Sequence, residues 1–257
     1  MIRWTFVIAY YNEAGFLADT LASLAAQGVP MRLVLVDNAS TDASPAIAAA
    51  FAAPGIETVL LREERPGKIH ALETAMPHLT TEFSAFGDAD TFYPSHYLTT
   101  ATRAFDADPR VVAVMALGVD ASSQPLRRRI YSGIVTRIWS KQTHTGGYGQ
   151  AFRTAALRAA GGFSERLWAY VLLDHEVMQR VAKQGRVVYP YDFWAIPSPR
   201  RTDRRRVRWT LPERILYHAT PFALKDWYFH HFLGPRLKAR GITHLNLRAK
   251  PWETPGA

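Results

Sequence analysis

The chain has 257 residues, a formal net charge of +9 and 48% hydrophobic residues. This length suits one large domain or two small ones, and the composition is that of a globular protein, not of a disordered, collagenous or coiled-coil chain. There is no cysteine. Disulfides, thiolate nucleophiles and cysteine-ligated metal sites are therefore excluded, and a reducing compartment is compatible with the sequence.

The first apolar run, Trp4–Tyr10, is too short for the hydrophobic region of a signal peptide, and no small-residue cleavage site follows it. Charged residues or histidines interrupt every long apolar stretch before it reaches the ~18–20 residues that span a bilayer. We therefore expect a cytoplasmic protein that does not cross a membrane by itself.

The positive charge is unevenly distributed along the chain. Residues 1–197 contain 18 Lys or Arg and 18 Asp or Glu, whereas residues 198–250 contain 13 Lys or Arg against three acids. We therefore expect a charge-balanced domain over residues 1–197 and a basic, aromatic-rich extension over residues 198–257. Such an extension favours an anionic partner, which is a phosphate-bearing ligand, an acidic membrane surface or nucleic acid.

Short β-branched runs alternate with Ala- and Leu-rich segments in the first part of the chain. The predicted strands are Thr5–Tyr10, Arg32–Asp37, Glu57–Leu61, Phe83–Gly87 and Val111–Leu117. The predicted helices are Ala14–Gln27, Ala43–Ala53, Lys68–Met76 and Ser95–Asp106. Nearly continuous apolar strands indicate a parallel sheet that crossover helices bury on both faces. The predicted fold class is α/β, with a Rossmann-like, mostly parallel central sheet flanked by helices.

The alternation fades after Gly118. Further predicted elements are helices over Arg127–Gln142 and Asp174–Gln184, a short Ala-rich helix ending at Gly161-Gly162, and strands over Gln150–Arg153 and Arg186–Tyr191. Two aromatic-rich amphipathic stretches, Leu211–Trp227 and Tyr228–Arg240, predict a helical C-terminal extension.

Polar residues follow three of the predicted strands. They are Tyr10-Tyr11-Asn12-Glu13, Asp37 to Asp42, and Asp88-Ala89-Asp90. Ligands of parallel sheets bind beyond the carboxyl ends of the strands, so these residues form the candidate site. Helix capping accounts for Asp42 but leaves Asp37 unexplained. In extended chain Asp88 and Asp90 point the same way, so both can face one hard cation or its water shell.

Gly67 and Lys68 open a predicted helix after a turn that contains Pro66. A lysine beside the exposed N–H groups of a helix start suits a phosphate, and the glycine permits close backbone approach. The alternative is a solvated lysine, in a position that the helix dipole disfavours for a cation.

Taken together, four segments resemble, in order and spacing, the motif series of glycosyltransferase family two. They are Val7 to Glu13, Val36 to Asp42, Gly67 to Leu72, and Asp88-Ala89-Asp90. Gly147 to Arg153 and Gly161-Gly162-Phe163 resemble the acceptor-side part of that family, and Leu173-Asp174-His175-Glu176 resembles its base-bearing segment. The resemblance implies a GT-A fold, with a nucleotide-sugar half over residues 1–118 and an acceptor half over 119–197. It also implies a nucleoside-diphosphate sugar donor, with UDP the expected nucleotide, a bound Mg²⁺ or Mn²⁺ and inversion at the anomeric carbon.

The resemblance also implies roles for individual residues. The base and ribose of the donor would lie beside Ala9, Tyr10, Glu13 and Asp37, and Gly67 and Lys68 would approach the donor. Asp88 would contact the ribose or a water bound to the metal, and Asp90 would ligate the metal itself. Asp174 would be the general base. Two positions depart from the family pattern. Asn38 replaces the second acid of the base-binding motif, so its contribution to donor binding must differ or move to Asp37. Leu173 replaces the glutamate before the base, which leaves Glu176 as an alternative base.

The segment Arg205-Arg206-Val207-Arg208-Trp209 resembles a motif that lies near the diphosphate and acceptor in some members of the family. Arg205, Arg208 and Trp209 are therefore included among the substrate-binding candidates. A run of arginines in a solvated loop is the competing interpretation, and the residues alone do not decide between the two.

Two other functions are considered, a nucleotidyltransferase and a nucleic-acid-binding module built on the basic extension. The first would carry a Gly-rich basic loop after the first strand, and Tyr10-Tyr11-Asn12-Glu13 is not one. The second would leave residues 1–197 without a purpose, so no nucleic-acid partner is expected. The basic and aromatic residues of Leu211–Arg240 instead favour a peripheral contact with the inner face of the cell membrane, and hence a lipid-linked or glycan-precursor acceptor.

Overall fold

A computed structural model describes residues 1–118, 130, 133–134, 146–198 and 210–247. The helix expected over Arg127–Gln142 lies almost entirely outside the described residues, as do Arg205, Arg208 and Trp209.

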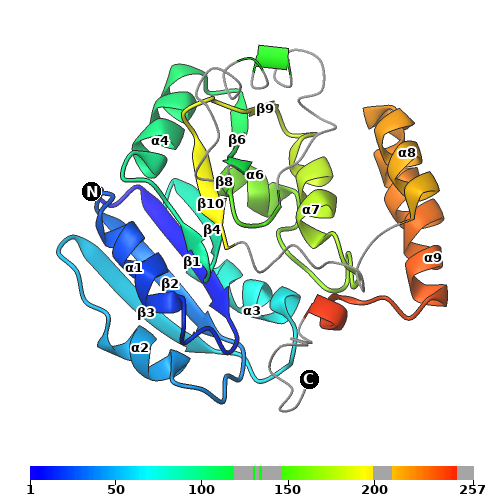
Figure 1. The fold of residues 1–257 in the computed structure, drawn as a ribbon. Helices are drawn as coiled ribbons and strands as arrows, with labels where there is room; N and C mark the ends of the chain where they lie inside the picture. Colours follow the sequence, from blue (N-terminus) through cyan, green and yellow to red (C-terminus); the bar gives the residue numbers. More distant parts are fainter. Residues whose placement is uncertain (119–129, 131–132, 135–145, 199–209, 248–257) are drawn as a thin grey trace.

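A central sheet of seven strands organises the molecule (Figure 1). In spatial order it contains β3 (Ile56–Arg62), β2 (Met31–Asp37), β1 (Trp4–Tyr10), β4 (Phe83–Asp88), β8 (Gln150–Arg153), β6 (Val111–Met115) and β9 (Arg186–Val188). The first four strands are parallel to one another, as their apolar sequences predict. The α/β fold with a mixed, mostly parallel sheet flanked by helices is confirmed.

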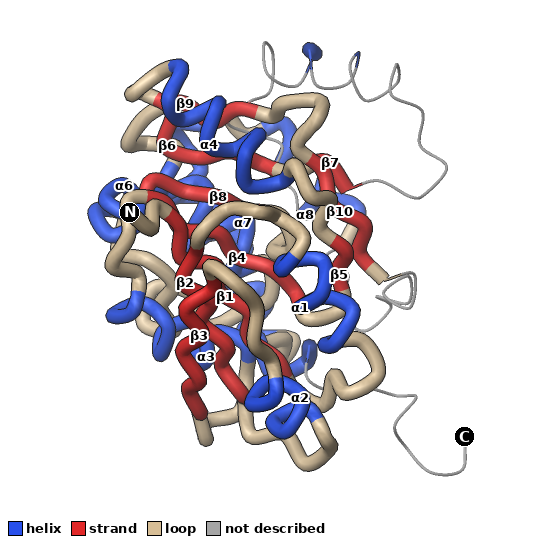
Figure 2. Tube along the Cα trace, turned by 90° about the vertical axis from the view of Figure 1, so that its left-hand side faces the viewer, coloured by secondary structure: helices blue, strands red, loops and turns tan. Residues whose placement is uncertain are grey.

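Strand β8 runs antiparallel to both of its neighbours, β4 and β6. The strand is predicted at its observed bounds, but its place between two strands that precede it in sequence is not. In Figure 2 β8 lies between β4 and β6, so the chain after Gly149 returns into the middle of the sheet.

A second, three-stranded sheet lies beside the first and contains β5 (Thr91–Phe92), β10 (Trp194–Pro197) and β7 (Leu117–Gly118) (Figure 2). The single strand expected over Val111–Leu117 is therefore two strands in two sheets. Between them the N–H of Ala116 donates to the carbonyl of Gly149, and the N–H of Leu117 donates to Phe193. At this point the chain leaves the central sheet and enters the three-stranded sheet.

Helices cover both faces of the central sheet because alternate strand residues point to opposite sides. Phe6 and Ile8 of β1 face one core, which α1 (Leu17–Ala25), α2 (Ser44–Ala50) and α4 (Tyr97–Ala107) cover. Val7 faces a second core, which α3 (Lys68–Ala75), α6 (Thr154–Ala159), α7 (Leu173–Val181) and part of the C-terminal segment cover.

The C-terminal segment contains α8 (Leu211–Ala219), η3 (Phe222–Leu224), a π-helical stretch η4 (Trp227–Leu233), α9 (Gly234–Ala239) and η5 (His244–Leu247). Helices α8 and α9 lie along one side of the molecule beyond α7 (Figure 1). The helical stretch expected over Leu211–Trp227 stops at Ala219, because Pro221 cannot continue the helix. Tyr217, Tyr228 and Phe229 pack into the second core.

Helices α1 and α7 and strand β9 are shorter than predicted. Helix α1 begins at Leu17, not at Ala14, because the carbonyl of Glu13 accepts the N–H groups of both Phe16 and Leu17 and closes a turn before the helix. Helix α7 ends at Val181, and Lys183 and Gln184 continue it only as a turn before Gly185. Strand β9 ends at Val188, shortly before Pro190.

Candidate functional site

The carboxyl ends of β1, β2 and β4 meet at one edge of the sheet. In the strand register Tyr10 lies opposite Asp37, and its neighbour Ala9 lies opposite Asp88. Asp37 and Asp88, the last residues of β2 and β4, therefore flank the end of β1. Asp37, Asp88 and Asp90 are each at most 5% exposed.

The loops that follow β1 and β2 are joined by their own polar side chains. The hydroxyl of Ser40 accepts the N–H of Asn12, and Oδ1 of Asn12 accepts the N–H of Thr41 at 2.8 Å. Asp42 accepts the N–H groups of Ala14 and Ser44, so it joins the turn after β1 to the first residue of α2. These hydrogen bonds fix the backbone around the strand ends.

Asp37 is held in place on both of its carboxylate oxygens. Oδ1 accepts the N–H of Ser40 at 3.0 Å, and Oδ2 contacts a guanidinium nitrogen of Arg62 at 2.8 Å. Burial, and next the charge of Asp37, raise the pKa of Tyr10 well above its ordinary value. Tyr10 is therefore a neutral hydrogen-bonding group beside a fixed carboxylate.

Asn38 binds the loop that leads into α3. Its Nδ2 donates to the carbonyls of Glu63 and Arg65 at 3.1 and 2.7 Å, and its Oδ1 accepts the N–H of Gly67 at 2.7 Å. An aspartate could not donate to the two carbonyls. The departure from the family pattern at this position thus has a structural reason in this chain.

Glu63 stabilises the same loop. Its carboxylate accepts the N–H of Arg65 at 2.8 Å, contacts the Arg65 guanidinium at 2.9–3.0 Å and accepts the Thr74 hydroxyl at 2.6 Å. The hydrogen bond from Arg65 is the main reason that the pKa of Glu63 falls from 4.5 to about 2, with Thr74 contributing and burial opposing.

Gly67 and Lys68 connect this loop to the acids. Gly67 has a φ of +121° and packs against His244, whose Nδ1 would lie 2.3 Å from a Cβ at this position. A side chain is thus excluded on both conformational and steric grounds. Lys68 begins α3, and its Nζ forms an ion pair with Oδ1 of Asp88.

The end of β4 is set by close packing. A Cβ at Gly87 would lie 2.3 Å from the hydroxyl of Tyr93 and 2.7 Å from the Phe6 ring. That hydroxyl accepts the N–H of Asp88 at 3.0 Å and donates to the carbonyl of Tyr148 at 2.9 Å. Tyr93 therefore positions Asp88, a role that the sequence analysis missed because no motif or spacing marks it.

Asp90 lies between the two sheets. The carbonyl of Asp90 accepts the N–H of Ser198, and β5, which follows it directly, pairs with β10. The two strand-end acids supply carboxylate oxygens, which are the donors that Mg²⁺ and Mn²⁺ prefer. Their chemistry and their burial fit a divalent cation.

Asp174 lies in the first turn of α7 and faces the same region. A Cβ at Gly147 would lie 3.3 Å from Nζ of Lys68 and 3.7 Å from Cβ of Asp174, so the two side chains approach the glycine together. Oδ1 of Asp174 accepts the N–H of His175, and Gln150 donates to its carbonyl at 3.1 Å. The structure thus brings Asp174 near the pair of Lys68 and Asp88.

Glu176 lies elsewhere, although it is only two residues from Asp174. It is 1% exposed, its carboxylate contacts the Arg180 guanidinium twice at 2.8 Å, and His230 lies 3.5 Å away. Burial alone would raise the pKa of Glu176, but His230 and Arg180 hold it below the ordinary range. Arg180 also donates to the carbonyls of Ala160 and Gly162, so Glu176 belongs to a buried structural ion pair.

Among the described residues no helix is long and apolar enough to cross a bilayer.

Comparison with known proteins identifies the family. The protein family described as "Glycosyl transferase family 2" matches residues 5–163 of this chain. The succinoglycan biosynthesis protein ExoO of Rhizobium meliloti (strain 1021) is 42% identical over 65 residues, which are 24% of this chain and 19% of that protein. The chain thus matches only about a fifth of the length of this curated relative.

Two solved structures share the fold. The mannosyltransferase PcManGT from Pyrobaculum calidifontis, solved in complex with GDP-Man and Mn²⁺, is 27% identical, with a TM-score of 0.70 over 97% of this chain and 71% of that one. TarS from S. aureus, solved with UDP-GlcNAc, is 18% identical, with a TM-score of 0.64 over 92% of this chain and 73% of that one, and shows the fold alone. With a GT-A-like fold and more than half of its length matched, the chain belongs to glycosyl transferase family 2.

Proposed function

We propose that this chain transfers a sugar from a nucleoside-diphosphate sugar to an acceptor hydroxyl, with inversion at the anomeric carbon. The observation that carries the proposal is the convergence of Asp37, Asp88, Lys68 and Asp174 around the carboxyl ends of β1, β2 and β4. Membership of the family supports it, and it replaces the nucleotidyltransferase and nucleic-acid-binding alternatives.

In this proposal the base and ribose lie beside Ala9, Tyr10, Glu13 and Asp37, and the diphosphate lies toward Lys68. Asn38 acts indirectly, because its amide is engaged by the loop that carries Gly67 and Lys68. Arg205, Arg208 and Trp209 remain proposed contacts of the diphosphate and acceptor.

Asp174 is the proposed general base. Its carboxylate takes the proton of the acceptor hydroxyl while that oxygen bonds to the anomeric carbon from the face opposite the diphosphate. The bond from this carbon to the diphosphate oxygen breaks, and the departing nucleoside diphosphate keeps the electron pair. The opposed faces of attack and departure account for inversion.

Asp90, with Asp88, would hold Mg²⁺ or Mn²⁺, and Asp90 is the main proposed ligand because Lys68 already contacts Oδ1 of Asp88. The ion would neutralise negative charge on the diphosphate. PcManGT was solved with Mn²⁺, which supports a divalent cation in this chain.

The acceptor is proposed to be a lipid-linked or glycan precursor reached at the inner face of the cell membrane. Helix α8 buries Glu213 and Tyr217, whereas Leu211 and Ile215 on the same helix are 67% and 60% exposed. Leu224 and Trp227 are also exposed, as are the basic residues Arg214, Arg236 and Lys238. Apolar side chains beside basic ones are typical of a segment that lies in a headgroup layer.

The buried face of α8 contacts the helix that carries the proposed base. The hydroxyl of Tyr217 on α8 lies 3.4 Å from Nδ1 of His175, and His175 follows Asp174 on α7. An acceptor headgroup at the membrane surface would thus approach the site from the side of α7 and α8, which are neighbours in Figure 1.

The function is tested by measuring release of nucleoside diphosphate from a panel of UDP-, GDP- and dTDP-sugars, with Mn²⁺ and with a membrane lipid extract as the acceptor source. We expect release of nucleoside diphosphate from one class of donor, and UDP-sugars are the first expectation. GDP-mannose is included in the panel because PcManGT was solved with GDP-Man. An absence of release from every donor, by protein that remains folded, would contradict the proposal.

A further inference from the structure

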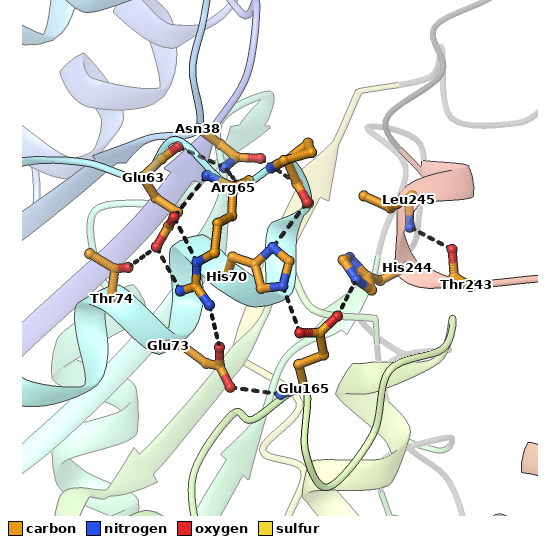
Figure 3. Close-up of polar contacts among 12 residues, drawn as sticks. Asn38, Glu63, Arg65, His70, Glu73, Thr74, Glu165, Thr243, His244 and Leu245 are labelled. Atoms are coloured by element: carbon orange, nitrogen blue, oxygen red, sulfur yellow. Dashed lines mark hydrogen bonds and ion pairs between the residues drawn. The ribbon is translucent and has the colours of Figure 1, made fainter.

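Three side chains outside the proposed active site meet at one point, although they are far apart in the sequence (Figure 3). They are His70 of α3, Glu165 from the loop between α6 and α7, and His244 of η5. Nε2 of His70 lies 2.9 Å from Oε2 of Glu165, and Nε2 of His244 lies 3.2 Å from Oε1 of the same carboxylate. The side chains of His70 and His244 are 10% and 3% exposed.

One nitrogen of His70 is hydrogen-bonded to the backbone, and the other faces the Glu165 carboxylate. Nδ1 of His70 lies 3.0 Å from the carbonyl of Pro66, and because a carbonyl only accepts, Nδ1 carries the proton. In the neutral ring Nε2 then has a lone pair, which faces the Glu165 carboxylate. Two acceptors 2.9 Å apart repel each other unless a positive charge joins them. In the described part of the chain no hydrogen-bond partner is aligned with this buried Nε2.

We propose that His70, Glu165 and His244 bind a divalent transition-metal ion, with Zn²⁺ the best fit. Two imidazoles and a carboxylate are a set of ligands that zinc uses. Their ligand atoms all lie within 4.8 Å of one another. Zinc bonds of ~2.0–2.1 Å in a tetrahedron place ligand atoms roughly 3.3 Å apart, close to the two contacts seen here.

The ligand set also separates this site from the one at the end of β4. Asp88 and Asp90 offer oxygen only, which suits Mg²⁺ and Mn²⁺, whereas imidazole nitrogen favours zinc. The Glu165 side chain is 42% exposed, so solvent reaches the cluster and a water can complete the coordination.

The surroundings hold the ligands in place. The carbonyl of Pro66 orients the His70 ring, and Oε1 of Glu73 accepts the N–H of Glu165 at 2.7 Å. Arg65 lies 3.9 Å from the other oxygen of Glu73 and links the cluster to Glu63 (Figure 3). Such second-layer contacts fix the tautomer and orientation of metal ligands.

The site would fasten the C-terminal segment to the start of α3. His244 packs on Gly67, one residue before Lys68, and the N–H of His244 donates to the carbonyl of Ala169. A metal joining His70 to His244 would therefore stabilise the backbone that presents Lys68, without touching the substrate. Its role would be structural.

The test uses untagged, full-length protein, dialysed against a weak chelator after addition of ZnCl₂, with bound zinc measured by plasma mass spectrometry and affinity by competition with a zinc indicator. We expect one zinc per chain in the wild type. His244→Gln and Glu165→Gln should each lower the affinity for zinc by more than ~10–100-fold, the loss expected when only a residue that supports a metal ligand is changed. His231→Gln, an exposed histidine of the same segment, and Asp90→Asn should both retain the zinc.

Two results would overturn the proposal. One is a wild-type protein that retains no zinc, in which case a proton on His70 balances Glu165. The other is retention of the zinc by His244→Gln and Glu165→Gln, or loss of the zinc from Asp90→Asn. Because these variants can affect folding, Co²⁺ is also added to the wild-type protein. We expect ligand-field bands in the absorption spectrum and a raised Tm. An unchanged spectrum and an unchanged Tm would contradict the site.

Discussion

At the scale of single residues, two carboxylates on one helix have different surroundings. Asp174 lies near Lys68, whereas Glu176 is buried against Arg180. We predict that Asp174→Asn lowers the transfer rate by ~10²–10⁴ while donor binding is kept, the range expected for loss of a general base. Turnover and the Kd for the donor are measured separately.

Glu176→Gln provides the comparison for this prediction. It should lower the Tm, because it weakens a buried ion pair with Arg180, and the turnover of the folded fraction should stay near that of the wild type. The assignment of the base is wrong if Glu176→Gln is folded but inactive while Asp174→Asn turns over normally.

Asn38 gives a second prediction at this scale. Asn38→Asp replaces two donated hydrogen bonds to the carbonyls of Glu63 and Arg65 by a carboxylate facing those oxygens. We expect the free energy of unfolding to fall by roughly 1–3 kcal/mol, the cost of buried groups left without partners. Urea denaturation measures this change.

Asn246→Asp is the matched control, because the Asn246 side chain contacts Thr243 through its oxygen, which an aspartate retains. Its unfolding free energy should be close to that of the wild type. Equal stabilities of Asn38→Asp and the control would show that the amide of Asn38 does not hold the loop.

At the scale of elements, the loop between β3 and α3 should respond to acid through Glu63. Its pKa is lowered from 4.5 to about 2, chiefly by the hydrogen bond from Arg65. The folded state therefore favours the carboxylate, and the resulting stability is complete above about pH 4.5 and is lost as the pH falls through about 2. Glu63→Gln should be less stable than the wild type at neutral pH.

Urea denaturation of both proteins from pH 7 downward measures this dependence. The difference between them should shrink below about pH 4.5. Glu64→Gln is the control, since Glu64 is 71% exposed and exposed ion pairs contribute little. A difference between wild type and Glu63→Gln that is constant with pH would contradict the assigned role of Glu63.

Local patterns predicted much of the fold. Apolar runs marked β1, β2 and β4 to within one residue at each end, because a strand buried on both faces has few polar positions. Non-local pairing was not predictable in this way. Strand β8 is antiparallel between β4 and β6, and β5 pairs with β10 across about a hundred residues, and neither arrangement leaves a trace in local periodicity.

The same distinction holds for the candidate site. Asp37, Asp88 and Asp90 lie at or just after strand ends, so the rule that ligands bind there selects them as candidates, and Lys68 is a candidate because it opens a helix. The cluster of His70, Glu165 and His244 has no such signature, because its ligands are widely separated in sequence and meet only where η5 and the loop before α7 pack on α3.

At the scale of the whole molecule, the C-terminal segment has both buried and exposed apolar residues. Tyr217, Tyr228 and Phe229 belong to a core, so removing the segment would expose that core, and surface variants are the better test. We predict that the wild type sediments with anionic liposomes at low salt and that the double variant Leu211→Ser, Ile215→Ser binds at least roughly tenfold more weakly, since each buried side chain contributes about 1.5–3 kcal/mol.

Leu60→Ser is the control for this experiment, because Leu60 is an exposed leucine of β3 outside that surface. It should bind like the wild type. Equal binding by the double variant and the wild type, or no binding by either at low salt, would exclude the membrane contact and favour an acceptor in solution.

A crystal structure of the protein with Mn²⁺ and a nucleoside diphosphate, with UDP and GDP tried in parallel, tests the proposed donor site most directly. We predict that the nucleotide lies at the carboxyl ends of β1, β2 and β4, with its base beside Asp37, its diphosphate toward Lys68 and the metal on Asp90. Nucleotide bound elsewhere on the molecule, or Mn²⁺ bound away from Asp90, would contradict it.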